Sequence, residues 1–174
     1  IHMNNISHVF INLKHGPFGY LNLNSQDGYG CEPCNVNVSC ALGYGWERER
    51  KSVAVILGQY NMAPNTYFGF CSGAVINNTA QDGRPLFLTA NHCIESDPAL
   101  YDPFNWLFLF NYETSTCNDD GSSVSSSLIQ SVYGALVRSK DFTGSQTSDF
   151  LLLELNTSLT TLTSYGVVYA GWEA

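Results

Sequence analysis

The sequence predicts an all-β protein, built as an antiparallel barrel or sandwich. Short runs of strand-forming residues recur along the chain and are separated by Gly, Asn and Ser. No long stretch shows the apolar spacing of an amphipathic helix. The links between the runs have hairpin length, and six or more short strands joined in this way are typical of antiparallel barrels and sandwiches.

The first 30 residues are expected to form an arm that precedes the main domain. Residues 8–13 alternate in character and indicate a strand, Gly16-Pro17 indicates a turn, and residues 20–23 indicate a second short strand. The whole chain of 174 residues is long enough for one large domain, or a domain with an arm, to bury a substantial core. We therefore expect the core within residues 31–174.

The remaining strands follow one another at short intervals. The stretch 77–83 is a turn in which Asp82-Gly83 supplies a positive φ at low cost. Residues 94–104 indicate a surface loop, and the Ser-rich link 119–127 is the best candidate for a mobile loop. The predicted strands are 52–57, 67–77, 84–90, 106–112, 128–138, 150–155 and 165–170.

Composition and charge exclude two classes of partner. The net charge is −8, and only seven Lys and Arg residues are present, so no basic stripe could neutralise nucleic-acid phosphates. No apolar run approaches the roughly 18 residues that span a bilayer. Six cysteines in a chain with few lysines favour an oxidising compartment, so we expect a secreted or extracellular protein.

Candidate catalytic residues follow one strand and precede another. The apolar run 84–90 leads into Asn91-His92-Cys93, where we expect a short helical turn, and Asp149 stands directly before the apolar run 150–155. A lone histidine is more often structural, and Asp149 alone would be an ordinary carboxylate at the start of a strand. Together they acquire a mechanism, because a carboxylate bonded to one imidazole nitrogen fixes the tautomer and stabilises the imidazolium that forms when the other nitrogen takes a proton.

Several further motifs occur in a fixed order along the chain. They are the stretch Cys34-Asn35-Val36-Asn37-Val38-Ser39-Cys40, residues 70–93 from Phe70-Cys71-Ser72-Gly73 to His92-Cys93, Asn111-Tyr112 before Cys117, Ser148-Asp149-Phe150, and Ala170-Gly171-Trp172. Taken together, they resemble the bacterial lysyl endopeptidase branch of the trypsin-like serine proteases. The resemblance runs from about residue 30 to the end of the chain.

The resemblance implies a fold of two β-barrels, with residues 31–174 forming the first, N-terminal barrel. It implies that His92 is the general base and Asp149 its orienting partner. The nucleophilic serine, the oxyanion hole and the lysine-selecting pocket belong to the second barrel, which we expect to be absent from this chain. Gly121-Ser122-Ser123 lacks the flanking pattern of a nucleophile, and no Gly-x-Ser-Gly segment occurs. The chain alone is therefore expected to be inactive.

Four of the six cysteines have partners that the resemblance implies, and Cys31 and Cys34 have alternatives. The resemblance implies that Cys40 pairs with Cys117 and Cys71 with Cys93, while Cys34 would reach into the second half. Because Cys31 adds a thiol three residues from Cys34, a local Cys31–Cys34 disulfide is the favoured alternative. A metal site built from Cys31, Cys34 and a histidine such as His15 is disfavoured because a second Cys-x-x-Cys is missing. A redox role lacks the strand–helix context of a thioredoxin.

Two hypotheses of function remain. The first is the N-terminal barrel of a secreted serine endopeptidase that cleaves peptide bonds after Lys, without metal or cofactor. Its partners would be a polypeptide substrate and the missing second barrel, and the exposed interface would allow self-association. The alternative is a non-catalytic, protease-like binding module. Continuation of the parent reading frame past Ala174 into a Gly-x-Ser-Gly segment would favour the first.

Overall fold

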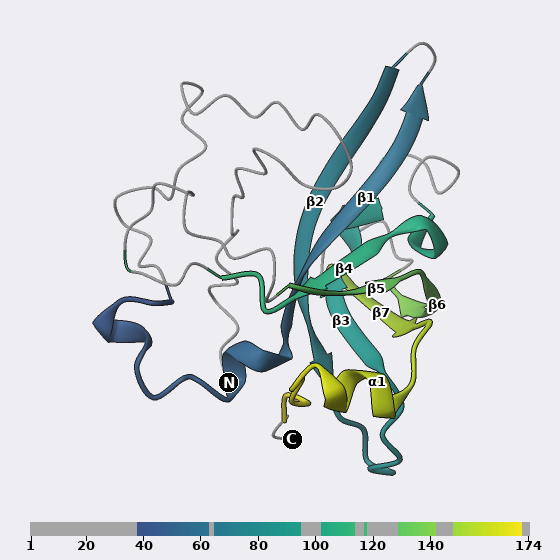
Figure 1. Cartoon of the computed structure of the whole chain (residues 1–174). Helices are drawn as coiled ribbons and strands as arrows, with labels where there is room; N and C mark the ends of the chain where they lie inside the picture. Colours follow the sequence, from purple (N-terminus) through teal and green to yellow (C-terminus); the bar gives the residue numbers. More distant parts are fainter. Residues whose placement is uncertain are drawn as a thin grey trace.

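The computed structural model describes residues 38–62, 65–94, 102–113, 117, 129–141 and 148–171. In these ranges seven strands form one antiparallel sheet in the order β5-β4-β1-β2-β3-β7-β6 (Figure 1). The strands are β1 (Val53–Met62), β2 (Asn65–Ile76), β3 (Leu86–Ala90), β4 (Leu107–Phe110), β5 (Gln130–Tyr133), β6 (Ala135–Lys140) and β7 (Phe150–Leu155). Helical structure in the same ranges is short: α1 (Leu159–Ser164) and the 3₁₀ turns η1 (Ala41–Gly43), η2 (Glu49–Ser52), η3 (Asn91–Ile94) and η4 (Pro103–Asn105). The predicted all-β class is confirmed.

A bend at Gly134 links the two end strands of the sheet. β5 and β6 lie at opposite ends of the strand order, yet only Gly134 separates them in the chain, so the sheet must curl until its two ends meet. Gly134 has a φ of 79°, and a Cβ there would lie 2.7 Å from the carbonyl oxygen of Phe104 and 2.6 Å from the Asn156 amide nitrogen. Its N–H donates to Trp106 and its carbonyl accepts from Asn156. This bend requires glycine.

The core lies inside the curled sheet. Alternation along β7 buries Leu151, Leu153 and Leu155, as expected for a strand with one face inward. Phe87 of β3 and Phe108 of β4 meet edge to face, with ring centroids 5.1 Å apart. Burial of each such side chain contributes about 1.5–3 kcal/mol. The site described below is therefore attached to the ends of strands whose inner faces are fixed by packing.

Only the inner part of the β1–β2 hairpin pairs with other strands of the sheet. β4 pairs with β1 only from Ala54 to Leu57, whereas β1 and β2 remain paired as far as Met62 and Asn65. Figure 1 shows the outer part of this hairpin projecting beyond the other strands as a two-stranded ribbon.

The structure corrects two predicted strands, while others lie outside the described residues. The single strand expected at 128–138 is two strands, because the chain bends at Gly134. The strand expected at 165–170 is wrong: α1 ends at Ser164, a turn follows at residues 165–166, and Ala170 forms only an isolated parallel bridge with Ile76. Hydrogen bonds to single residues, from Val168 to Lys51 and from Ala170 to Val75, anchor the segment instead of a strand ladder. The expected strands at 8–13 and 20–23 lie outside the described residues.

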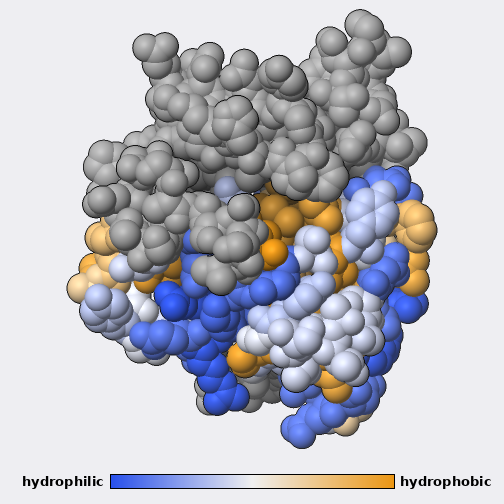
Figure 2. All heavy atoms as spheres, viewed as in Figure 1, coloured by the Kyte–Doolittle hydropathy of each residue, from blue (hydrophilic) through white to orange (hydrophobic). Residues whose placement is uncertain are grey.

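Apolar side chains also occur on the surface. Figure 2 shows hydrophilic residues over much of the described surface on one face, with apolar residues in separate patches. Large exposed side chains follow or lie on η1 (Leu42, Tyr44 and Trp46) and on β5 and β6 (Tyr133, Leu136 and Val137). Among the described residues, no helix is long and apolar enough to cross a membrane.

Candidate active site

Strand pairing brings His92 and Asp149 together. β3 ends at Ala90 and η3 begins at Asn91, while Asp149 precedes the first residue of β7. Because β3 and β7 are antiparallel and Ala90 is paired with Phe150, the end of one strand lies beside the start of the other. The N–H of Asn91 donates to the carbonyl of Asp149 at 3.0 Å and continues this ladder by one step. The expected helical turn at His92 is present as η3.

The Asp149 carboxylate contacts His92 twice. Its Oδ2 lies 2.6 Å from the ring Nδ1, and its Oδ1 accepts a hydrogen bond from the His92 backbone N–H at 2.8 Å. A carboxylate at Nδ1 favours the tautomer that carries its proton there, which leaves Nε2 as the acceptor. The His92 side chain is 42% exposed and that of Asp149 is 47% exposed, so the pair lies at the surface of the barrel.

Asp149 adopts an unusual backbone conformation. Its φ is 42°, in the left-handed region that non-glycine residues seldom occupy, although Asp and Asn tolerate it better than most. Residues held in this region cluster at functional sites, where surrounding contacts maintain the conformation. The conformation here allows the backbone of Asp149 to pair with Asn91 while its side chain faces His92.

The contacts of Asp149 also determine its charge. Partial burial raises the pKa of the carboxyl, but the hydrogen bonds from the His92 ring and backbone outweigh this, and the net pKa lies below its usual value. Asp149 is therefore ionised near neutral pH, as a residue that stabilises an imidazolium must be.

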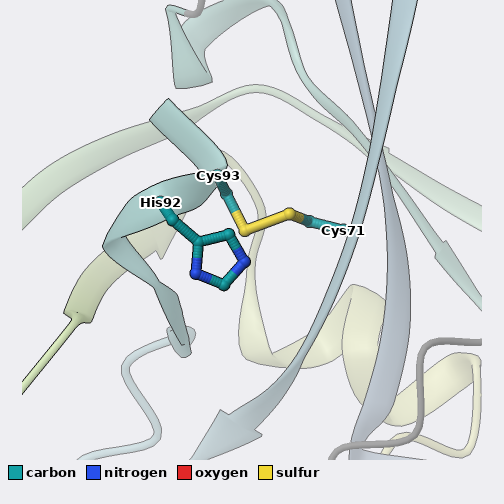
Figure 3. Close-up of side chains that lie close together, drawn as sticks. All are labelled: Cys71, His92 and Cys93. Atoms are coloured by element: carbon teal, nitrogen blue, oxygen red, sulfur yellow. A yellow bond between two sulfur atoms is a disulfide. The ribbon is translucent and has the colours of Figure 1, made fainter. Parts of the chain in front are cut away.

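The Cys71–Cys93 disulfide fixes the turn that carries His92. It joins β2 to η3 across a sequence separation of 22 residues, and Figure 3 shows the His92 ring beside its two sulfur atoms. Buried Thr89 adds a second anchor, since its hydroxyl donates to the carbonyl of Ser72 at 2.7 Å. In the sequence, Thr89 was a signal only as part of the Thr-Ala pair that precedes His92 in the motif, and its contact with Ser72 could not be predicted from that position.

Cys71, His92 and Cys93 lie close together, and their proximity alone makes them resemble a set of metal ligands. A ring nitrogen of His92 and the sulfurs of Cys71 and Cys93 lie within 4.8 Å of one another. The ligand in cysteine metal sites is the thiolate, and both sulfurs here are joined in a disulfide. This cluster therefore does not form a metal site in the oxidised protein.

The other cysteines are placed as follows. The Cys40–Cys117 disulfide is present and spans a sequence separation of 77 residues. Both pairs implied by the sequence resemblance thus occur in the structure. Cys31 and Cys34, together with His15, lie outside the described residues, so their pairing stays a prediction.

Comparison with known proteins gives a consistent result. Residues 30–174 match the family described as lysyl endopeptidase, C-terminal domain. A curated lysyl endopeptidase of Pseudomonas aeruginosa is 30% identical over 153 residues, which cover 86% of this chain. The matched region is 30% of the length of that relative.

Proposed function

The chain belongs to the lysyl endopeptidase C-terminal domain family, and from this premise we propose that it forms the barrel that carries the general base of a secreted serine endopeptidase. In this proposal the C-terminal domain of the family contains both barrels of the trypsin-like fold, and the sheet of this chain is the first of the two. Two disulfides and the similarity to a lysyl endopeptidase are consistent with a secreted protein.

The observation that carries the proposal is the contact between His92 and Asp149. With Nδ1 bonded to the carboxylate, Nε2 of His92 is the atom that takes the proton from a serine hydroxyl as the serine attacks the substrate carbonyl. The imidazolium formed is stabilised by Asp149 and then gives the proton to the leaving amine, which yields an acyl-enzyme that water hydrolyses. A binding module has no need for both residues in this arrangement.

The nucleophile is the part of the mechanism that we assign to a second barrel. The 174 residues contain no Gly-x-Ser-Gly segment. The proposed second barrel supplies the serine, the oxyanion hole and a pocket for the lysine side chain that precedes the cleaved bond. The substrate would be a polypeptide bound between the two barrels.

The purified 174-residue chain tests the proposal that the nucleophile lies on a second barrel and not in this chain. A serine-directed phosphonate is expected to label no serine, and lysyl ester substrates are expected to remain intact, because the oxyanion donors and the nucleophile act together with the base. Stoichiometric labelling of any serine in this chain would place the nucleophile within it and overturn the proposal.

The roles of His92 and Asp149 are tested in the parent reading frame. We expect that frame to encode a Gly-x-Ser-Gly segment and its product to cleave lysyl esters. There, His92→Ala should lower kcat by about 10⁶-fold and Asp149→Asn by about 10⁴-fold. Asp82→Asn is the matched control, since this exposed carboxylate bonds Asn78 and Arg84 and should leave kcat unchanged. A parent protein that binds peptides but cleaves none would favour the binding module.

A further inference from the structure

We propose that Asp141 is a positioning residue for the Asp149–His92 pair, because it holds the backbone on both sides of Asp149. The inference rests on the proposed function, since it concerns how the candidate acid is presented to the candidate base. Asp141 follows β6 directly and is half-buried.

Two sets of contacts connect Asp141 to the neighbours of Asp149. On one side, the carboxylate Oδ2 of Asp141 accepts a hydrogen bond from the Ser148 hydroxyl at 2.8 Å and from the Ser148 N–H at 3.3 Å. On the other side, the N–H of Asp141 donates to the carbonyl of Phe150 at 3.1 Å. One residue thus binds both the residue before Asp149 and the residue after it.

These contacts act where the backbone needs support. Asp149 has a φ of 42°, and such a conformation persists only where its surroundings maintain it. The Asn91 N–H holds the carbonyl of Asp149 itself. With Ser148 and Phe150 held by Asp141, the direction of the Asp149 side chain is fixed, and its two oxygens reach the N–H and the ring of His92.

Only part of this arrangement depends on the side chain of Asp141. The bond from its N–H to Phe150 continues the β6–β7 ladder beyond the Lys140–Leu151 pair, and any residue except proline could donate it. The contacts to Ser148 require an acceptor on a short side chain. Asp141→Asn retains such an oxygen, whereas Asp141→Ala does not, and neither variant changes His92 or Asp149.

The test is nuclear magnetic resonance of the oxidised 174-residue chain, with two readouts at the pair. The first is the downfield proton signal of the His92 Nδ1–H bonded to a carboxylate, and the second is the pKa of Asp149. Asp141→Ala is expected to weaken or abolish the proton signal and to raise the pKa of Asp149 toward its usual value, because the hydrogen bonds that lower it are lost. Asp141→Asn is expected to keep the signal and not to raise this pKa.

The sign of the change separates positioning from simple electrostatics. Removing a negative charge near Asp149 would by itself lower the pKa of Asp149, which is opposite to the effect of losing its position. An Asp141→Ala variant with an unchanged or lowered Asp149 pKa and an intact proton signal overturns the proposal. Equal effects of the Ala and Asn substitutions also overturn it, because they would show that the oxygen contact is not what matters.

A second variant keeps the test decisive if Asp141→Ala fails to fold. Ser148→Ala removes the hydroxyl contact at an exposed position and leaves Asp141 in place. It should shift both readouts in the same direction by a smaller amount, and no shift would refute the proposal. Neither readout requires turnover. If the parent protein proves non-catalytic while Asp141→Ala still disturbs the pair, the proposed function fails and the positioning role stands.

Discussion

The carboxylate of Asp149 accepts two hydrogen bonds from a single neighbour, one from the His92 backbone and one from its ring. The backbone contact fixes where η3 begins relative to β7, and the ring contact fixes the plane and tautomer of the imidazole. Hydrogen bonds to an ionised acceptor are stronger than neutral ones. One side chain therefore sets both the position of the turn and the orientation of the base that the turn carries.

Asp149→Asn should reduce stability near neutral pH and have little effect in strong acid. The folded pKa of Asp149 lies below its usual, unfolded value, so its contribution is complete above the unfolded pKa and is lost as the pH falls through the folded pKa. Because the side chain is nearly half exposed, we expect a cost of about 1 kcal/mol or less at pH 7. Asn tolerates a positive φ, so the backbone should not change.

Urea unfolding of the wild type and Asp149→Asn, measured at a series of pH values, checks this prediction. The two free energies of unfolding should converge as the pH falls from about 5. A constant difference across the series would mean that the ionised carboxylate contributes nothing to folding through His92.

Among the elements, the continuous segment from β5 to β6 decides the shape of the sheet. It pairs with β4 before Gly134 and with β7 after it, so one segment serves both ends of the strand order. The bend requires a positive φ together with a close approach of Phe104 and Asn156 to the backbone. The positive φ and the close approach are two separate reasons for glycine at position 134, and their effects on stability can be measured separately.

Gly134→Ala should destabilise the protein more than Gly166→Ala. Both glycines have a positive φ, 79° and 71°, so both substitutions carry the same conformational strain of about 1–3 kcal/mol. A Cβ at Gly166 meets nothing within 4 Å, whereas a Cβ at Gly134 would overlap the Phe104 carbonyl. Guanidinium unfolding should give a larger loss for Gly134→Ala by at least about 1 kcal/mol. Equal losses would show that the close approach relaxes at no cost.

The sequence predicted those elements whose own residues determine them. The strands around 52–57 and 150–155 have strong strand-forming runs, and the motif around His92 identified the pair with Asp149 because each residue adjoins such a strand. Tertiary contacts decided the rest. Leu159–Ser164 consists of Leu, Thr and Ser, which are mostly weak helix formers, yet a Ser158 cap and the full burial of Leu162 make it helical.

At residues 165–170 the sequence favours a strand that tertiary contacts do not form. Tyr165, Val167, Val168 and Tyr169 favour a strand by propensity, but only Ala170 finds a bridge partner. Asp141 was not predictable either, because its contact with Ser148 depends on the pairing of β6 with β7, and no local sequence pattern records that pairing.

At the scale of the whole molecule, the two disulfides cross-link loops of very different length. Cys40–Cys117 joins the segment before β1 to the segment after β4, with a separation of 77 residues. Cys71–Cys93 joins β2 to η3, with a separation of 22 residues. The first constrains the unfolded chain more strongly, and the second lies beside the candidate base.

The variant Cys40→Ser/Cys117→Ser should lose about 4 kcal/mol of unfolding free energy, and Cys71→Ser/Cys93→Ser about 3 kcal/mol, if loop entropy dominates. Each double variant is the control for the other, because each removes two sulfurs and leaves the remaining pair intact. Non-reducing guanidinium unfolding measures both. A larger loss for the shorter loop would show that packing around η3, and not loop entropy, accounts for the effect of that bridge.

The change of pairing partner at Gly134 also bears on how two copies of the chain could meet. A long, straight strand with free N–H and C=O groups is a template for edge-to-edge addition and for aggregation. Here β5 has four residues and β6 has six, a bulge interrupts β6 between Val137 and Ser139, and β6 carries Arg138 and Lys140. Each of these features makes an edge strand less able to pair with a strand of another molecule. Another molecule would therefore find no extended strand to join at these two edges, and contact there would involve side chains such as Leu136 and not a shared sheet.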